Sequence, residues 1–502
     1  MELEFKQQTI SYLQLSFSKT ISQEQTQEMI VPDSFPDCAR IVFTGASAIM
    51  RGRECREGNA LVTGSVRASV LYVPEDGTQP RALSCDLPYS IRADDGALTQ
   101  KTQLYACVRV CAAEARLINS RKILVRVELV CELAGYAQAE QTLYEVQNPP
   151  DILQRKTAHY RLSLPQELAE KTFSTTQELE LSGAEPEAES IVHYWLTPTL
   201  AEQKLNGTRA VFKGTLTLKV LYLTADGAPE ILLRQIPFSQ FCELAKAYDD
   251  DALRLCICLS GSELALSRAA DAPEKLLLSV SVLCQCVSLR AQELCITQDA
   301  YTTRGEFTPQ WEALAIPCLL DRQTLCAPLR GSVPAEARSV VDSTLYLAAP
   351  SQQRGDCGAF LRAPATVNIL YYDGQGSLQS AVVRDAVSLE IPCGAGAVCE
   401  AALLPGPDGF AAPSGGGMDI RYDVAFDVFC RCEQALTTLC GGEITQEQAQ
   451  TEKFCVVVRK NAKTQPLWDL ARQYRTSVAA IAQANALETE EAEAGALLLI
   501  PV

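Results

Sequence analysis

Apolar and polar residues alternate in three segments of the chain that resemble one another. The segments are VTGSVRASVLYVPEDG (62–77), FKGTLTLKVLYLTADG (212–227) and the shorter ATVNILYYDG (365–374). Each contains a Leu-Tyr pair, and the pairs begin at Leu71, Leu221 and Leu370, which are 150 and then 149 positions apart. An apolar residue at every second position, with polar residues between, predicts a half-buried antiparallel strand with one face in water. An Asp-Gly pair ends each segment and predicts a tight hairpin turn.

A second strand pattern closes each of these units. The matching segments are KILVRVELVCEL (122–133), KLLLSVSVLCQC (275–286) and RYDVAFDVFCRC (421–432). A proline also precedes each Leu-Tyr pair at nearly the same distance, at Pro36, Pro186 and Pro334. Two strand patterns that recur at one spacing predict a threefold internal repeat. Each unit is long enough to bury its own core, so we expect an antiparallel β-sandwich or a barrel-like sheet in each.

After Gly442 the spacing of the apolar residues becomes that of a helix. We expect a strand at 454–458, helices at 467–474 and 477–485, and a closing strand at 496–502 beside the first one. The predicted fold class is therefore mainly β, with three tandem repeats followed by a small α+β domain. The predicted domains are 1–150, 151–310 with a linker at 148–166, 311–448 with a mobile Gly- and Pro-rich loop at 406–417, and 449–502.

The composition is that of a globular protein, with 47% hydrophobic and 21% charged residues. Sixty-one acidic residues against 44 basic ones give a formal charge of −17. This charge argues against nucleic-acid binding and against electrostatic docking on anionic lipid. No apolar run approaches the ~18 residues of a membrane span, and MELEFKQQTISYLQ does not resemble a secretory signal. We therefore expect a soluble, cytoplasmic protein.

The 21 cysteines are odd in number, which favours free thiols in a reducing compartment. Three Cys-x-Cys pairs are candidate metal ligands, at Cys256/Cys258, Cys284/Cys286 and Cys430/Cys432. Residues i and i+2 of a strand lie about 6.5–7 Å apart, and zinc sites usually use Cys-x₂₋₄-Cys. The first repeat has Leu133 at the place of Cys286, so the thiols are expected to fill the core. Metal binding and redox switching remain open as alternatives.

Only two histidines occur, His159 and His193, and neither stands near a nucleophile motif. We expect ordinary surface or packing roles for both. The sequence therefore predicts no catalytic residue, no metal site and no cofactor, which is the pattern of a protein that is not an enzyme.

The C-terminal segment resembles a LysM module. The residues that carry the likeness include Val458, Leu467-Trp468, Ala471, Tyr474 and Asn485. Where LysM modules have Gly-Asp-Thr before Leu-Trp, this chain has Thr464-Gln465-Pro466, a departure that weakens the expectation of glycan binding. Trp468 is expected to lie in the core. The candidate binding residues, for a partner or a glycan, lie in the two loops: Lys463, Thr464, Gln465, Pro466, Asn485, Leu487, Glu488 and Thr489.

The repeats resemble SPOCS-domain proteins. The likeness rests on IVPDSFPDCARIV (30–42), ARLINSRKILVRVEL (115–129) and QDAYTT (298–303). SPOCS units followed by one LysM module are the layout of spore-envelope morphogenetic proteins. The resemblance implies a mother-cell protein at the forespore surface that helps to localise spore-coat material. It also implies that the LysM-like tail contacts the spore-coat ATPase and that other coat proteins are partners.

Two further possibilities remain at this point. Unpaired sheet edges of the repeats could support self-association. The alternative function is that of a peptidoglycan-binding LysM protein of the spore cortex or cell wall.

Overall fold

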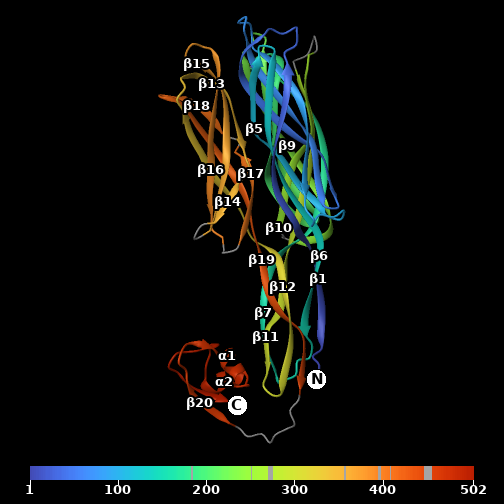
Figure 1. Ribbon diagram of the computed structural model, residues 1–502, viewed down its shortest axis with the longest axis vertical. Helices are drawn as coiled ribbons and strands as arrows, with labels where there is room; N and C mark the ends of the chain where they lie inside the picture. The colour runs from blue at the N-terminus through green and yellow to red at the C-terminus, as the bar shows by residue number, and fades with distance from the viewer. Residues whose placement is uncertain are drawn as a thin grey trace.

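The computed structural model describes residues 1–181, 185–249, 252–268, 275–354, 358–393, 397–406, 409–445 and 455–502. It is mainly β, with two short helices close to the C-terminal end, and this confirms the predicted fold class at that level (Figure 1). Neither helix has the length and apolar character needed to cross a bilayer, a finding that covers all described residues.

The first 146 residues form two three-stranded antiparallel sheets. One has the order β1 (Phe5–Ile30), β6 (Lys122–Val146) and β5 (Gln103–Asn119). The other has the order β2 (Cys38–Arg56), β3 (Asn59–Pro74) and β4 (Arg81–Asp94). Alternate residues of β3 and β6, such as Val66 and Val127, are buried in one common cluster. The apolar residues at every second position of the two sheets therefore face a common core that lies between the sheets.

The second stretch pairs its strands in the same way. The last strand, β11 (Lys275–Thr302), lies between β7 (Leu153–Glu180) and β10 (Ala252–Ser267). The other sheet contains β8 (Ala188–Thr224) and β9 (Pro229–Asp249). The two halves of β8 approach each other, because a Cβ atom on Gly214 would lie 2.2 Å from the Thr199 carbonyl oxygen. Gly64 of β3 has the equivalent approach to Ile49 of β2, at 2.1 Å.

The third stretch follows the same order with shorter pieces. β19 (Gly417–Thr445) lies between β12 (Glu306–Val333) and the two short strands β17 (Val398–Pro405) and β18 (Phe410–Ser414). β15 (Ala359–Asp373) pairs with β13 (Ala337–Leu347), β14 (Ser351–Arg354) and β16 (Leu378–Ile391). In all three stretches the first long strand pairs with the last one.

Two local predictions are wrong, and one predicted domain boundary falls within a strand. The expected linker at 148–166 is strand from Leu153 onward, because Leu162 and Leu164 are buried in one cluster with Leu294 and Ile296 of the paired strand β11. The expected loop at 406–417 contains β18, which pairs with β19; Pro407 and Asp408 lie outside the described residues. The predicted division between 310 and 311 falls inside β12, which begins at Glu306.

The tyrosines of the Leu-Tyr pairs face the core of their own stretch. Tyr72 donates a hydrogen bond to the carbonyl oxygen of Pro36 at 3.0 Å, and Tyr222 donates to that of Pro186 at 3.3 Å. Each bond lets a buried phenol keep a hydrogen-bond partner. The two bonds join equivalent positions of the first two stretches, the recurring proline and the tyrosine 36 residues after it.

The leucines of the same pairs face the other way and meet one another. Leu71, Leu221 and Leu370 are buried in one cluster with Phe43 and Val192. The sheets that contain β3, β8 and β15 therefore cover each other's outer faces. This contact lies in the head, by which we mean the wide upper part of the molecule (Figure 1). The prediction that the polar face of β3 lies in water is therefore wrong, because Ser69 on that face is only 1% exposed.

Below the head, the lower halves of the six long strands form a stalk (Figure 1). The first-with-last pairs β1–β6, β7–β11 and β12–β19 each add apolar side chains to one cluster. Its members include Ile10, Leu143, Leu164, Leu294, Ile316 and Leu436. The stalk therefore joins the three stretches a second time, along a core separate from that of the head.

Residues 455–502 form the tail, at the foot of the stalk (Figure 1). Its order is β20 (Val456–Lys460), α1 (Leu467–Gln473), α2 (Val478–Asn485) and β23 (Leu497–Pro501). β20 and β23 pair antiparallel, and a small bridge joins β21 (Gln465–Pro466) to β22 (Glu491–Ala492). These elements lie where the apolar spacing of the sequence predicts them.

Candidate interaction surfaces

The two predicted binding loops of the tail lie next to each other. Gln465 and Pro466 pair with Ala492 and Glu491, and the backbone N–H of Leu467 donates to the carbonyl oxygen of Glu490 at 2.7 Å. Lys463, Thr464, Pro466, Glu488 and Thr489 are exposed, whereas Gln465, Asn485 and Leu487 are half-buried. The structure therefore brings the predicted residues to one region but does not present all of them to solvent.

Asn485 has a structural role. Its side-chain amide donates to the carbonyl oxygens of Ile481 at 2.8 Å and Leu499 at 2.6 Å, and its Oδ1 accepts from the N–H of Leu499 at 2.7 Å. The two bonds with Leu499 tie the end of α2 to β23, and the bond to Ile481 lies within α2. The side chain has no hydrogen left for a ligand, since an amide offers two N–H donors.

The loops are also braced from within. Asn461 donates to the carbonyl oxygens of Ala492 at 2.9 Å and Glu493 at 3.1 Å, and its Oδ1 accepts from Gln465 at 3.0 Å. Thr464 accepts a bond from the N–H of Ala494 at 3.3 Å. Thr489 donates to the carbonyl oxygen of Glu491 at 3.1 Å. Gln465 and Thr489 are thereby engaged inside the tail, which leaves Lys463, Pro466 and Glu488 as the freely presented members of the predicted set.

Helix α1 of the tail packs on the end of β11 in the stalk. Trp468 donates from Nε1 to Oδ2 of Asp299 at 2.8 Å, and Arg472 pairs with the same carboxylate at 2.9 Å. The ring of Tyr301 lies edge-on to the Trp468 ring at 5.0 Å, and its hydroxyl donates to the carbonyl oxygen of Thr476 at 2.7 Å. Burial raises the pKa of Tyr301 to about 12, so the phenol stays protonated and can donate.

This contact accounts for two sequence signals. Asp299 and Tyr301 belong to QDAYTT (298–303), one of the segments on which the family resemblance rests. Trp468 lies half-buried between the tail core and Tyr301, so the prediction of a core role is close to what the structure shows. Its ring is covered by another part of the chain and is not presented as a flat stacking platform.

The outer face of the β20–β23 sheet is an exposed apolar surface that the sequence reasoning missed. Val456 and Val458 of β20 are 57% and 59% exposed, and Leu497 and Leu499 of β23 are 67% and 41% exposed. The register places Val458 directly opposite Leu499. The alternate residues Leu498 and Ile500 point inward, to the helices. We call the four exposed side chains the aliphatic face.

A signal for this surface is present in the sequence. The segments Val456-Val457-Val458 and Leu497-Leu498-Leu499-Ile500 are apolar at consecutive positions. A strand that is apolar on both faces is normally buried on both. In the tail the helices cover one face, and nothing in the described part of the chain covers the other.

His193 joins two stretches of the chain in the head. It is 2% exposed, and its Nδ1 and Nε2 lie 2.9 Å from Oγ of Ser69 and 3.0 Å from Oγ of Ser47. Burial, with the positive charges of Lys219 and Arg67, lowers its pKa to about 3. The neutral ring and two serine hydroxyls resemble a base beside a nucleophile, but a solute cannot reach them there. The contact serves packing, as predicted for this residue, whereas His159 is exposed on the stalk.

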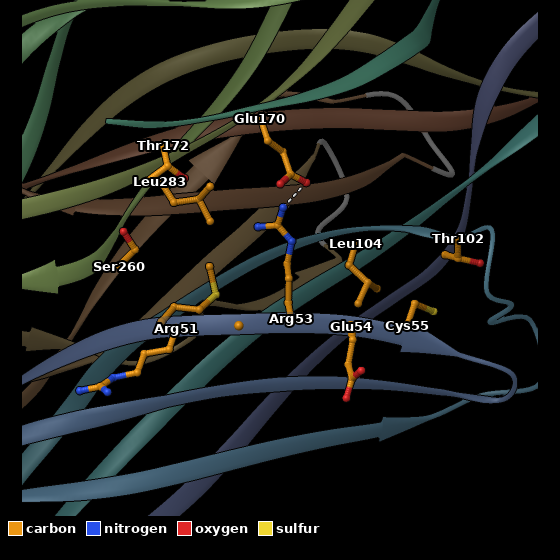
Figure 2. A pocket seen from close by; sticks show the side chains of 12 residues that line it. Arg51, Arg53, Glu54, Cys55, Thr102, Leu104, Glu170, Thr172, Ser260 and Leu283 are labelled. Carbon is orange, nitrogen blue, oxygen red and sulfur yellow. Dashed lines mark ion pairs between the residues drawn. The ribbon is translucent and has the colours of Figure 1, made fainter. Parts of the chain in front are cut away.

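A groove of about 520 Å³ lies between the first and second stretches (Figure 2). Its lining comes from β2 and β5 on one side and from β7, β10 and β11 on the other. The guanidinium of Arg53 reaches across it and pairs with Glu170. Because the Arg53–Glu170 ion pair spans this groove, we interpret it as a contact between two sheets and not as a binding site.

Most cysteines fill the core, as predicted. Cys131, Cys284 and Cys430 occupy equivalent buried positions on the last strands. Burial raises the pKa of Cys131 and Cys284 to about 12, which keeps these thiols protonated. One group departs from this pattern: Cys107, Cys256 and Cys258 place three Sγ atoms within 4.8 Å of one another, the only such His, Cys, Asp or Glu group among the described residues.

We compared the chain with protein-family models and with curated proteins, and neither comparison finds a match.

Proposed function

We propose that the chain is a non-enzymatic spore-envelope morphogenetic adaptor. In this proposal three SPOCS-like β-sandwich repeats form the head and stalk, and a LysM-like tail docks the spore-coat ATPase. The protein then helps to localise coat material around the forespore, in the mother-cell cytoplasm. The family assignment rests on the sequence resemblance, and it is consistent with three stretches that share one strand pairing and with the βααβ order of the tail.

The observation that carries the docking role is the aliphatic face of the tail. Four large aliphatic side chains on a two-stranded sheet leave apolar surface in water, which is unfavourable by roughly 25 cal/mol per Å². Contiguous exposed apolar patches of this kind mark protein–protein contacts. Exposed Lys460 and Lys463 lie on β20 and in the loop after it. The surface therefore suits a protein partner with an apolar patch and acidic groups at its rim.

The tail can contact the stalk and a partner at the same time. The stalk contact uses Trp468 and Arg472 of α1, on the helical side of the tail. The aliphatic face lies on the other side of the sheet, because Leu497 and Leu499 alternate with the inward-facing Leu498 and Ile500. An adaptor needs such an arrangement, with one side fixed to the scaffold and the other free.

The test is capture of the coat ATPase by the full chain and by two tail variants. Val458→Asp with Leu499→Asp places charges on the aliphatic face, and we expect capture to be lost. Glu488→Gln with Thr489→Ala is the matched control in the predicted loops, because the docking argument uses neither residue, and we expect it to retain capture. Equal thermal unfolding of both variants shows that the tail is intact.

Undiminished capture by the aspartate variant would refute docking through this face. Sedimentation with purified peptidoglycan tests the alternative. Co-pelleting that is lost in the loop variant and kept in the aspartate variant would favour the glycan-binding function instead.

A further inference from the structure

The three-cysteine group lies where the first and second stretches meet. Cys107 is on β5 of the first stretch, whereas Cys256 and Cys258 are on β10 of the second. Cys258 and Cys256 pack with the core of the first stretch, not with that of their own. Cys107 lies opposite Glu132 of β6 and Cys256 lies opposite Gln285 of β11, and these two residues follow the equivalent Cys131 and Cys284. The same strand position therefore supplies a thiol from each side.

The sulfur atoms converge, contrary to the expectation for i and i+2 on a strand. The Sγ atoms of Cys256 and Cys258 are 3.4 Å apart, and all three Sγ atoms lie within 4.8 Å of one another. Both side chains of β10 leave the same face and turn toward each other across Cys107. Three sulfurs around one metal ion need separations of about 4 Å, given metal–sulfur bonds near 2.3 Å.

The backbone around the group is held firmly. Gln285, which is fully buried on β11, donates from Nε2 to the carbonyl oxygen of Ala106 at 2.7 Å and accepts from the N–H of Ala106 at 3.0 Å. Cys258 also donates to that carbonyl at 3.6 Å. A side chain of the second stretch thus fixes the residue next to Cys107. Such supporting bonds set the positions of metal ligands in known sites.

The charges nearby suit a thiolate site. Arg254 lies over the ring of Tyr105 at 4.8 Å and pairs with Glu400 at 3.1 Å. Glu400 is shared with Arg431, and Arg109 pairs with Glu132 at 2.8 Å. Three guanidinium groups therefore face two carboxylates, and the remaining positive charge offsets part of the negative charge of a buried thiolate site.

We propose that Cys107, Cys256 and Cys258 form a three-coordinate site for a soft thiophilic cation, Cu(I). Soft thiolate ligands select Cu(I), zinc and iron–sulfur clusters, whereas a structural zinc site uses four ligands. The group holds three sulfurs, and no fourth His, Cys or carboxylate ligand belongs to it in the described chain. Binding releases the thiol protons to solvent, changes no oxidation state and ties the first stretch to the second. This inference is independent of the docking role of the tail.

The test uses the purified full chain, reduced and free of oxygen, titrated with Cu(I) in the presence of a chromophoric Cu(I) chelator. We expect the wild-type chain to withdraw one Cu(I) from the chelator, with an X-ray absorption signal of three sulfur neighbours. Cys107→Ser, Cys256→Ser and Cys258→Ser should each weaken binding by more than the ~10–100-fold that loss of a supporting residue costs. Cys318→Ser removes a thiol from another close pair, Cys318 and Cys432 at 3.8 Å, and should bind as wild type.

Several results would overturn the proposal. The first is that the wild-type chain takes no Cu(I) from the chelator. The second is that the Cys107→Ser variant binds Cu(I) as tightly as the wild type. The third is an X-ray absorption signal with two sulfur neighbours or with nitrogen neighbours. Preferential stoichiometric binding of Zn(II) would also overturn it. The absorption signal is measured on the wild-type chain and does not depend on the folding of any variant.

Discussion

The centre of the head and the tail both carry aliphatic side chains on the outer face of a small sheet, and they use them differently. In the head, Leu71, Leu221 and Leu370 are buried because each sheet is covered by the sheets of the other two stretches. In the tail, Val458 and Leu499 stay in water. The comparison indicates that the apolar outer face of a sheet serves as a contact surface. The head forms this contact within the chain, and we propose that the tail forms it with another molecule.

The largest effect is expected at the contact in the head. Leu221→Ala leaves a cavity among three sheets and should lower the free energy of unfolding by ~2–5 kcal/mol. Leu233→Ala is the matched control on the next strand, because Leu233 is 57% exposed, and it should change stability by less than ~0.5 kcal/mol. Thermal unfolding of both variants checks this. Equal melting temperatures would mean that the three outer faces do not depend on each other.

The stability of the same contact should depend on pH, because His193 is buried there. The folded pKa of about 3 lies below the ordinary value of 6.5, so the unfolded chain binds the extra proton between these values. This contribution to stability is therefore complete above pH 6.5 and is lost as pH falls toward 3, with a slope of at most ~1.4 kcal/mol per pH unit.

The measurement compares unfolding of the wild type and His193→Gln between pH 7 and 4.5. Glutamine keeps a polar side chain near Ser47 and Ser69 but does not titrate, so the pH dependence should become shallower. A parallel pH dependence in both proteins would contradict the burial of a neutral ring there.

A smaller effect is expected where the tail meets the stalk. Asp299→Asn weakens the bonds from Trp468 and Arg472 and should loosen the contact by about 1 kcal/mol. Asp469→Asn is the control, an exposed acid in the first turn of α1. Fluorescence energy transfer between dyes on the tail and the stalk should fall in Asp299→Asn only, and capture of the partner should persist. Unchanged transfer would show that this contact does not hold the tail.

The sequence predicts strands well where one pattern repeats, and it fails where the stretches meet. The alternation around Tyr72 and Tyr222 correctly indicates residues that face a core. It also suggests a wet opposite face, because Ser69 is polar and a period of two cannot show what covers a sheet from outside. The linker prediction fails for a related reason, since Leu162 and Leu164 are buried in a cluster to which all three stretches contribute.

The candidate site was predicted in part. The two tail loops lie next to each other, as their positions suggest. However, the side chains of Asn485 and Gln465 form hydrogen bonds within the tail, which the spacing of residues in the sequence does not reveal. The aliphatic face could have been found from strands that are apolar at every position. The three-cysteine group has a weaker signal: Cys107 and Cys256 are 149 positions apart, one fewer than the Leu-Tyr pairs of the first two stretches.

The most direct test of the account is hydrogen exchange of the full chain with and without the spore-coat ATPase. If the aliphatic face is the docking surface, backbone amides of 456–460 and 497–500 should exchange more slowly in the complex, and those of the head should not change. Protection confined to 463–466 and 487–489, or no protection in the tail at all, would contradict the central claim.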